Sequence, residues 1–199
     1  MGSLRNIVSG NLSVLAGNWD YTQFIGRQMN SLTVGVIGYG RLGSLYAKYC
    51  KAFSSRVVVY DPYKEVIDND FQQFHSLYSM LEISDIVAIH VHVTDETIGM
   101  ISQKYFNKMK QNVLLVNTAR GDIVNEKDLV NFLKNNPSAK VATDVLSDEI
   151  RNRLESPLLK FASTSDQVII TPHIGGMTRE AQEIAYGHAA MLLYNFVNH

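Results

Sequence analysis

Val34-Gly-Val-Ile-Gly-Tyr-Gly-Arg-Leu-Gly43 is the stretch that decides the fold of this chain, because it joins an apolar run to a loop with three spaced glycines. In a strand–loop–helix unit, Gly38 permits the tight turn after the strand, Gly40 lets the backbone approach a pyrophosphate, and Gly43 lets the helix pack closely on the sheet. The glycine spacing alone is weak evidence, because methyltransferases also place a glycine-rich loop after their first strand. The surrounding sequence has to decide between these classes.

That surrounding sequence supports a dinucleotide site. Residues 32–37 are mostly apolar and typical of a buried strand, and apolar side chains then recur at helical spacing over residues 42–53. The backbone N–H groups near Arg41 and Leu42 would face the phosphates from the N-terminus of this helix. A strand, a loop and a helix therefore follow one another in the required order.

The cofactor type follows from the residue that ends the second apolar run. Residues 56–60 are predicted to form a strand, and Asp61 stands at its end, about twenty residues beyond the glycines. A carboxylate at this place accepts hydrogen bonds from both ribose hydroxyls and repels a 2′-phosphate. We therefore predict that the chain binds NAD rather than NADP.

The composition limits the possible partners. The chain has 199 residues, 46% of them hydrophobic, with a formal net charge of -1 and a pI near 6.6, which gives no electrostatic reason to expect nucleic acid or an anionic membrane as partner. The single Cys50 lies among helical apolar positions, which predicts a buried thiol without a disulfide. With no apolar run long enough to cross a bilayer, we expect a cytoplasmic protein.

Apolar runs alternate with amphipathic segments along the rest of the chain. This alternation predicts an α/β fold with one doubly wound (Rossmann) parallel sheet and helices on both faces. Residues 7–31 are rich in aromatic side chains but show no clear strand or helix. Further strands are predicted over residues 85–91, 112–118, 140–146 and 167–171, and helices over 76–83, 102–110, 125–136 and from Thr178 to the end.

Charged residues are expected where ligands bind in such a sheet, beyond the carboxyl ends of the strands. Arg120 follows the fourth predicted strand, Glu149 the fifth and His173 the sixth. Hydride transfer to a 2-oxo acid needs a cation for the carboxylate and an acid for the developing alkoxide. The planar fork of Arg120 suits the first role. An unperturbed histidine has a pKa near neutrality, so His173 suits the second role, with Glu149 to keep it protonated and oriented.

Four stretches resemble, in this order, the motifs of the D-isomer-specific 2-hydroxyacid dehydrogenases, a family that includes phosphoglycerate dehydrogenase and D-lactate dehydrogenase. The resemblance implies that Arg120, Glu149 and His173 are catalytic, with His173 as proton donor in reduction and base in oxidation. It also implies that Asp144 meets the nicotinamide carboxamide. The stretches are Ser84-Asp-Ile-Val-Ala-Ile-His-Val91, Val116-Asn-Thr-Ala-Arg-Gly-Asp-Ile-Val-Asn-Glu126, Asp144-Val-Leu-Ser-Asp-Glu149 and Thr171-Pro-His-Ile-Gly-Gly-Met-Thr178. The predicted cofactor contacts are Gly38, Gly40, Arg41, Leu42, Gly43, Asp61, Val91, Thr118, Ala119, Asp144, Gly175 and Gly176.

The sequence departs from the family pattern at two sites near the motifs. His92 and Ile150 stand where the family usually has proline, and residues 150–166 form a longer segment between the Glu and His positions. We expect this segment to reshape one wall of the cleft, which leaves the substrate range open. Glu149 favours the hydroxyacid branch, because related formate dehydrogenases have Gln at that position.

The family resemblance also implies a domain organisation and an assembly. Family members carry a second, substrate domain, whereas this chain is expected to be an isolated cofactor domain. Residues 1–31 would form a linker helix and a dimerisation arm, and residues 32–199 the dinucleotide-binding domain. We expect a homodimer through the cofactor domains that binds NAD(H) and a small 2-hydroxy or 2-oxo acid, with poor turnover by this chain alone, since domain closure completes such a site.

Two alternatives remain open at this point. Some proteins of similar sequence are transcriptional corepressors that use NAD(H) binding to control partner association, and these can retain the same triad. A methyltransferase would bind S-adenosylmethionine and has no use for the His173 motif. His90 and His92 lie two apart on a predicted strand, but no third ligand has characteristic spacing, so we predict no metal site.

Overall fold

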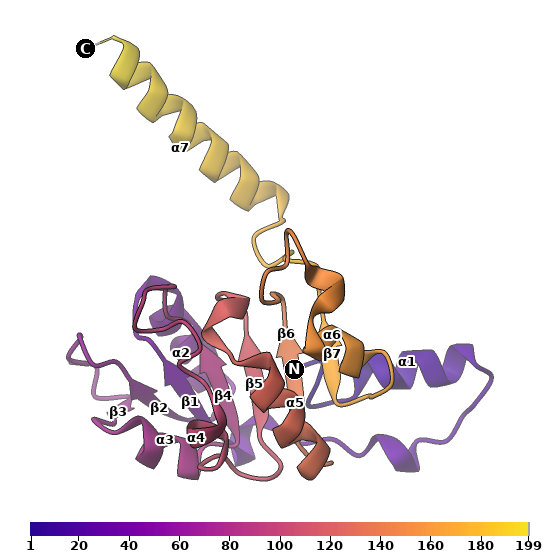
Figure 1. Cartoon of the computed structure of the whole chain (residues 1–199). Coiled ribbons are helices and arrows are strands. Elements are labelled where there is room, and N and C mark those ends of the chain that lie inside the picture. The colour runs from indigo at the N-terminus through magenta and orange to yellow at the C-terminus, as the bar shows by residue number, and fades with distance from the viewer. Residues whose placement is uncertain (199) are drawn as a thin grey trace.

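Seven strands form one parallel sheet in the computed structural model, which describes residues 1–198 (Figure 1). The strand order is β3-β2-β1-β4-β5-β6-β7, and every neighbouring pair is parallel. The chain winds outward from the centre in both directions, so the order reverses between β1 and β4, where such sheets bind ligands. The strands are β1 (Thr33–Ile37), β2 (Arg56–Tyr60), β3 (Gln72–Gln73), β4 (Ile86–Ile89), β5 (Leu114–Asn117), β6 (Lys140–Thr143) and β7 (Val168–Ile170).

Helices cover both faces of the sheet, as predicted. Alternate residues of β2 point into two different hydrophobic cores. Val58 belongs to the core that also contains residues of helices α3, α4, α5 and α6, whereas Val57 and Val59 belong to the core that contains residues of α2 and Met29. Cys50 lies buried in the second core, which confirms the prediction of a core thiol. The helices are α1 (Ile7–Leu15), α2 (Arg41–Ala52), α3 (Leu77–Ile83), α4 (Gln103–Phe106), α5 (Glu126–Asn135), α6 (Pro157–Ala162) and α7 (Arg179–Val197), with short 3-10 turns η1 (Thr22–Phe24), η2 (Met29–Ser31), η3 (Gly121–Ile123) and η4 (Arg153–Glu155).

Several predicted boundaries were wrong for identifiable reasons. The strands after β2 end earlier than predicted, because the residues that follow them leave the ladder to form loops at the carboxyl edge. The helix predicted over 102–110 ends at Phe106, since Lys108 and Met109 donate to carbonyls three residues back instead of four. β3 was missed because its two glutamines carry no apolar signal. α6 was also missed, within the segment 150–166.

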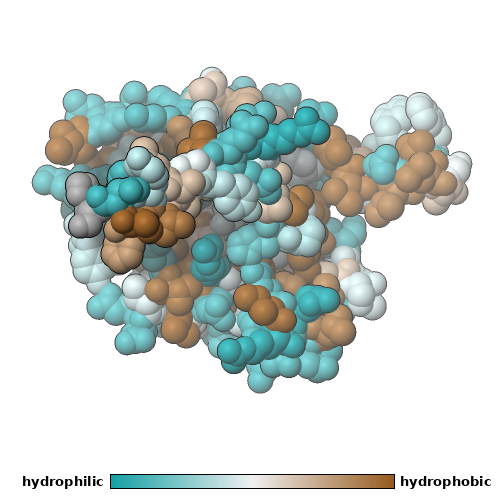
Figure 2. Space-filling model, turned by 90° about the horizontal axis from the view of Figure 1, so that it is seen from above, coloured by the Kyte–Doolittle hydropathy of each residue, from teal (hydrophilic) through white to brown (hydrophobic). Residues whose placement is uncertain are grey.

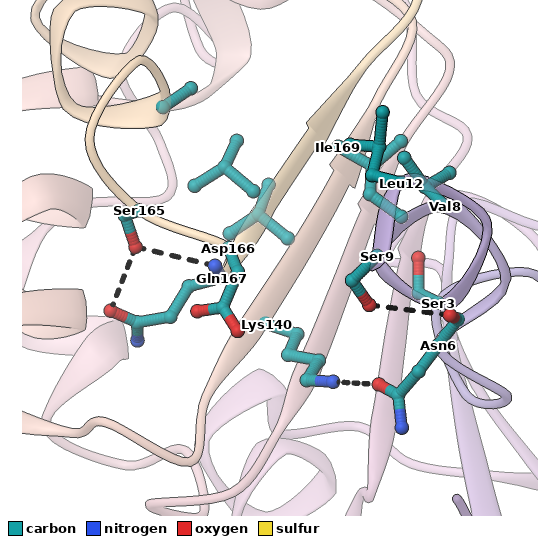
Figure 3. A pocket seen from close by; sticks show the side chains of 13 residues that line it. Ser3, Asn6, Val8, Ser9, Leu12, Lys140, Ser165, Asp166, Gln167 and Ile169 are labelled. Carbon is teal, nitrogen blue, oxygen red and sulfur yellow. Dashed lines mark hydrogen bonds between the residues drawn. The ribbon is translucent and has the colours of Figure 1, made fainter. Parts of the chain in front are cut away.

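The pattern of residues 7–31 showed no clear helix, and only the family resemblance implied a linker helix within residues 1–31, where the structure has α1. This helix buries no side chain and has Gly10 in its middle, so no one-sided apolar pattern marks it in the sequence. Figure 3 shows its attachment to the sheet, where Lys140 at the start of β6 donates a hydrogen bond to Asn6. A cavity of about 190 Å³ lies between this helix and β7.

Two segments project from the sheet in Figure 1, namely α7 at the C-terminal end and the segment that carries α1. α7 leaves the domain after the β7 loop and buries none of its residues, and it is where the helix predicted from Thr178 forms. His199 lies outside the described residues. Figure 2 shows hydrophobic side chains gathered on the lobe where Figure 1 places α1. Across residues 1–198, no helix combines the length and apolar character needed to cross a membrane.

Candidate active site

The glycine loop after β1 is shaped by close contacts. Gly38 has a φ of +90°, and a Cβ there would lie 2.8 Å from Val91 Cγ1. A Cβ on Gly43 would lie 2.0 Å from the carbonyl oxygen of Gly38, so α2 can begin this close to the strand only with glycine. At Gly40, by contrast, no described atom lies within 4 Å of an added Cβ. Packing within the chain thus requires two of the glycines, whereas the third borders open space.

A cavity of about 1080 Å³ lies beside this loop, at the point where the strand order reverses. Its walls come from the loops after β1, β2 and β4, and they include Gly38, Gly40, Asp61 and Val91. The Asp61 carboxylate is fixed there, because Oδ2 accepts from the backbone N–H of Tyr39 at 2.8 Å and Oδ1 from that of Tyr63 at 3.0 Å. Each oxygen keeps a lone pair for a further donor.

His173 and Glu149 meet at the carboxyl ends of β7 and β6. Nδ1 of His173 lies 2.5 Å from Oε1 of Glu149, and Oε2 of the same carboxylate accepts from the backbone N–H of Leu146 at 3.0 Å. The His173 side chain is 47% exposed and that of Glu149 is 27% exposed, so the pair faces solvent from a fixed base. The imidazole is therefore oriented by Nδ1, and Nε2 is left for a reacting group.

Asp144 organises the loop that carries His173. Its backbone carbonyl accepts from the N–H of His173 at 2.9 Å, and its carboxylate accepts from the Thr171 hydroxyl at 2.5 Å, the N–H of Ile174 at 2.9 Å and the N–H of Gly175 at 2.7 Å. Burial raises the pKa of Asp144, but these hydrogen bonds outweigh it and the net pKa lies below the usual value. Asp144 thus holds His173 in its left-handed backbone conformation, with a φ of +55°.

Arg120 lies on the neighbouring loop after β5 and is exposed. Asn117 fixes this loop, donating from Nδ2 to the Arg120 carbonyl at 2.9 Å and accepting from the Ala119 N–H at 3.1 Å. The next residue, Gly121, lies so close to the loop after β6 that a Cβ would stand 2.0 Å from the carbonyl carbon of Leu146. The loops that carry Arg120 and Glu149 are therefore packed together.

Glu126 is a buried anchor that the sequence analysis did not single out. Oε1 accepts from the backbone N–H of Ser147 at 2.9 Å, and Oε2 accepts from the hydroxyl of Ser156 at 2.6 Å. It thereby ties both sides of the loop that carries Glu149 to the start of α5. In the sequence, Glu126 appears only as the last residue of the second stretch that resembles the family. Its partners lie 21 and 30 residues away, a separation that no local pattern reveals.

His90 and His92 were predicted to lie on one strand. They lie in the loop after β4 instead, because β4 ends at Ile89. His90 packs against Tyr46 with ring centroids 4.8 Å apart, and its Nε2 is buried without a hydrogen-bond partner among the described residues. Burial lowers the pKa of His90 to about 4, so the ring is neutral at pH 7. Within residues 1–198, no three His, Cys, Asp or Glu side chains are grouped to hold a metal ion.

The predicted residues thus fall into two groups along the rim. The first group lies around the glycine loop: Gly38, Gly40, Asp61 and Val91 line the cavity, and Arg41, Leu42 and Gly43 begin α2. The second group stands on the loops after β5, β6 and β7 and includes both the residues named for catalysis and the predicted cofactor contacts Thr118, Ala119, Asp144, Gly175 and Gly176. Thr118 and Ala119 precede Arg120 on the β5 loop, and Gly175 follows His173, where a Cβ would lie 3.0 Å from Asp144 Oδ2.

Comparison with known proteins identifies the family of the chain. The family model for the D-isomer specific 2-hydroxyacid dehydrogenase, NAD binding domain, matches residues 1–175. A D-3-phosphoglycerate dehydrogenase of Archaeoglobus fulgidus is 40% identical over 184 residues, which are 92% of this chain and 34% of that protein. A hydroxypyruvate reductase of Thermotoga maritima is 33% identical over 183 residues, covering 89% of this chain and 57% of that protein.

Solved structures show the same relationship. A D-2-hydroxyisocaproate dehydrogenase superposes with a TM-score of 0.91 at 28% identity, covering 98% of this chain and 62% of the other. The D-lactate dehydrogenase of Aquifex aeolicus, solved with NAD and lactic acid, superposes with a TM-score of 0.85 at 30% identity, covering 99% and 63%. The chain spans about one third to two thirds of the length of these proteins. It belongs to the D-isomer-specific 2-hydroxyacid dehydrogenase family and comprises its NAD-binding domain.

Proposed function

We propose that this chain is the cofactor domain of an NAD-dependent D-2-hydroxyacid dehydrogenase, which transfers hydride between the nicotinamide and a D-2-hydroxy acid or the corresponding 2-oxo acid. The observation that carries the proposal is the contact of 2.5 Å between His173 Nδ1 and Glu149 Oε1. A histidine oriented by a carboxylate at one ring nitrogen is the arrangement that general acid–base catalysis needs at the other.

The residues around the large cavity fit a dinucleotide. The open space at Gly40 admits a pyrophosphate next to the backbone, and the N-terminus of α2 points its free N–H groups to the same place. The remaining lone pairs of Asp61 would accept from the ribose hydroxyls. Bound NADH would supply the hydride, and the chain supplies position and charge.

In this proposal each charged residue has a separate task. Arg120 grips the substrate carboxylate with its guanidinium and polarises the carbonyl. His173 gives the proton on Nε2 to the developing alkoxide in reduction and takes it back in oxidation. Glu149 keeps the imidazole oriented and stabilises its charged form. Asp144 holds the backbone of the His173 loop, and it is also the proposed partner of the nicotinamide carboxamide.

Substitution in the full-length protein tests the assignment. His173→Ala and Arg120→Ala are expected to lower kcat/KM for 2-oxo acids by about 10²–10⁴-fold while NADH affinity stays unchanged. Glyoxylate, pyruvate and hydroxypyruvate would serve as substrates, with NADH binding followed by calorimetry. If the protein instead acts as an NAD(H)-sensing corepressor-like module, the wild type would bind NADH without turnover, and this proposal would be wrong.

We also propose that the chain forms a homodimer through its cofactor domain, with the N-terminal arm within residues 1–31 at the interface. The stem of the arm is fixed, because the N–H of Arg27 donates to the Leu4 carbonyl at 3.0 Å. Its tip is apolar and open, with Trp19 86%, Tyr21 82% and Ile25 85% exposed. A rigid stem that presents aromatic side chains is suited to an interface. A monomeric mass by light scattering at micromolar concentration would contradict this assembly.

A further inference from the structure

Lys64 is a charged residue of the cofactor cavity that the proposed hydride transfer does not use. Its Nζ donates to the backbone carbonyl of Tyr39 at 3.0 Å and lies 5.4 Å from the centroid of the Tyr39 ring. The backbone N–H of the same Tyr39 donates to Asp61. The Lys64 ammonium therefore binds the backbone carbonyl of Tyr39, between Gly38 and Gly40, and the Asp61 carboxylate binds its backbone N–H. Both charged side chains line the same cavity.

The turn that carries Lys64 is held by several hydrogen bonds. Gln73 of β3 donates from Nε2 to the carbonyls of Asp61 at 3.2 Å and Lys64 at 2.8 Å, and its Oε1 accepts from the N–H of Val66 at 2.8 Å. The N–H of Tyr63 closes the turn onto the Asp61 carboxylate. The Lys64 ammonium is therefore directed at the glycine loop by a fixed backbone.

The ammonium has donors to spare. Lysine has three N–H donors, and the Tyr39 carbonyl takes one of those on Lys64. A phosphate monoester carries a charge of roughly −1.5 to −2 at pH 7 and accepts strong hydrogen bonds, for which lysine is a regular partner. With Asp61 ionised, its charge offsets that of Lys64 and repels such a group. Without that charge, Lys64 would attract it.

We propose that Lys64 is a latent ligand for the 2′-phosphate of NADP, and that the preference for NAD depends on the Asp61 charge alone. The inference rests on the proposed position of the adenine ribose beside Asp61. It makes Lys64 a specificity-determining residue whose effect becomes visible once the carboxylate is removed.

Calorimetric titration of the chain with NADH and NADPH tests this in wild type, Asp61→Ser, Lys64→Gln and the double variant. Asp61→Ser should bind NADPH about tenfold more tightly than wild type does. The double variant should lose about fivefold of that gain, judged by the ratio of NADPH to NADH affinity. Lys104→Gln is the matched control, because Lys104 lines the same cavity but lies over the Tyr105 ring, 4.8 Å from its centroid.

Equal NADPH to NADH ratios in Asp61→Ser and the double variant would overturn the role of Lys64. An equal loss in a variant that pairs Asp61→Ser with Lys104→Gln would do the same. If Asp61→Ser does not fold, Asp61→Asn takes its place, alone and combined with Lys64→Gln, and equal NADPH to NADH ratios in these two variants would refute the idea. A wild type that binds neither nucleotide would instead overturn the proposed cofactor site itself.

Discussion

Removal of the Asp85 carboxylate is expected to destabilise the domain far more than removal of an ordinary surface acid. Asp85 precedes β4, and its side chain is only 11% exposed. It accepts from the N–H of Thr33 at 2.9 Å, from Arg27 at 3.1 Å and from Lys110 at 3.2 Å. One carboxylate therefore joins the start of β1, the stem of the N-terminal arm and the segment before β5.

The magnitude follows from these three contacts. Asp85→Ala leaves the Thr33 N–H without its partner at the first residue of β1, which costs about 1–3 kcal/mol. Arg27 and Lys110 are 41% and 34% exposed, so each lost ion pair adds only about 0.5 kcal/mol in the presence of solvent screening. We expect the free energy of unfolding to fall by about 2–4 kcal/mol.

Urea denaturation of the chain measures this difference, with Glu82→Ala as the control. Glu82 pairs with Lys108 at 3.0 Å, but both side chains are about half exposed, so its removal should cost less than about 1 kcal/mol. Equal destabilisation by the two variants would refute the reasoning.

The pH dependence provides a second test of the same carboxylate. Burial raises the pKa of Asp85, but hydrogen bonds from Thr33, Arg27 and Lys110 outweigh it and leave the pKa lowered. A lowered folded-state pKa contributes stability above the unfolded value near 3.9 and loses it as the pH falls through the folded value. The gap between wild type and Asp85→Ala should thus be constant from pH 7 to 5 and close below about pH 4. A gap that closed as the pH rose would contradict the assignment.

Three further predictions concern the site. Gly40→Ala should unfold in urea like wild type but bind NADH at least about tenfold more weakly, because its Cβ enters the open space. Gly43→Ala should instead lose over about 1 kcal/mol of stability, because its Cβ meets Gly38. An NADH affinity equal to that of wild type in both variants would contradict this. Glu126→Ala should lower kcat of the full-length protein more than its NADH affinity, since Ser147 loses its anchor, and an equal loss in both would count against it. The isolated chain should bind NADH but reduce glyoxylate very slowly in a steady-state assay, and ordinary turnover would refute that expectation.

The sequence predicted the fold well where a local pattern carries the structure. Buried parallel strands such as β1 and β2 are continuous apolar runs, and the glycine loop has a spacing that few other structures require. The parallel sheet with helices on both faces follows from the alternation of these elements, although six strands were predicted and the structure has seven. The pairing of His173 with Glu149 was also expected from the order of the strand ends, and the structure brings the two side chains together.

Features that depend on contacts distant in sequence could not be predicted. Glu126 is an unremarkable helix-start acid until the fold brings Ser147 and Ser156 to it. Gly121 looks like a loop glycine, but its proximity to Leu146 exists only once β5 and β6 are paired. α1 lacks any sequence signal, since it buries no side chain and the apolar periodicity that marks a packed helix never arises.

The strand order separates the rim into two regions with different uses for protein engineering. Loops after β1 and β2 surround the nucleotide cavity, while those after β6 and β7 carry Glu149 and His173. With strands ~4.8 Å apart, β2 and β6 are separated by four spacings, or roughly 19 Å. Substitutions at such distances usually combine additively. Under the proposed roles, cofactor preference and acid–base chemistry are therefore expected to respond independently to substitution, and variants selected for one property can be combined with variants selected for the other.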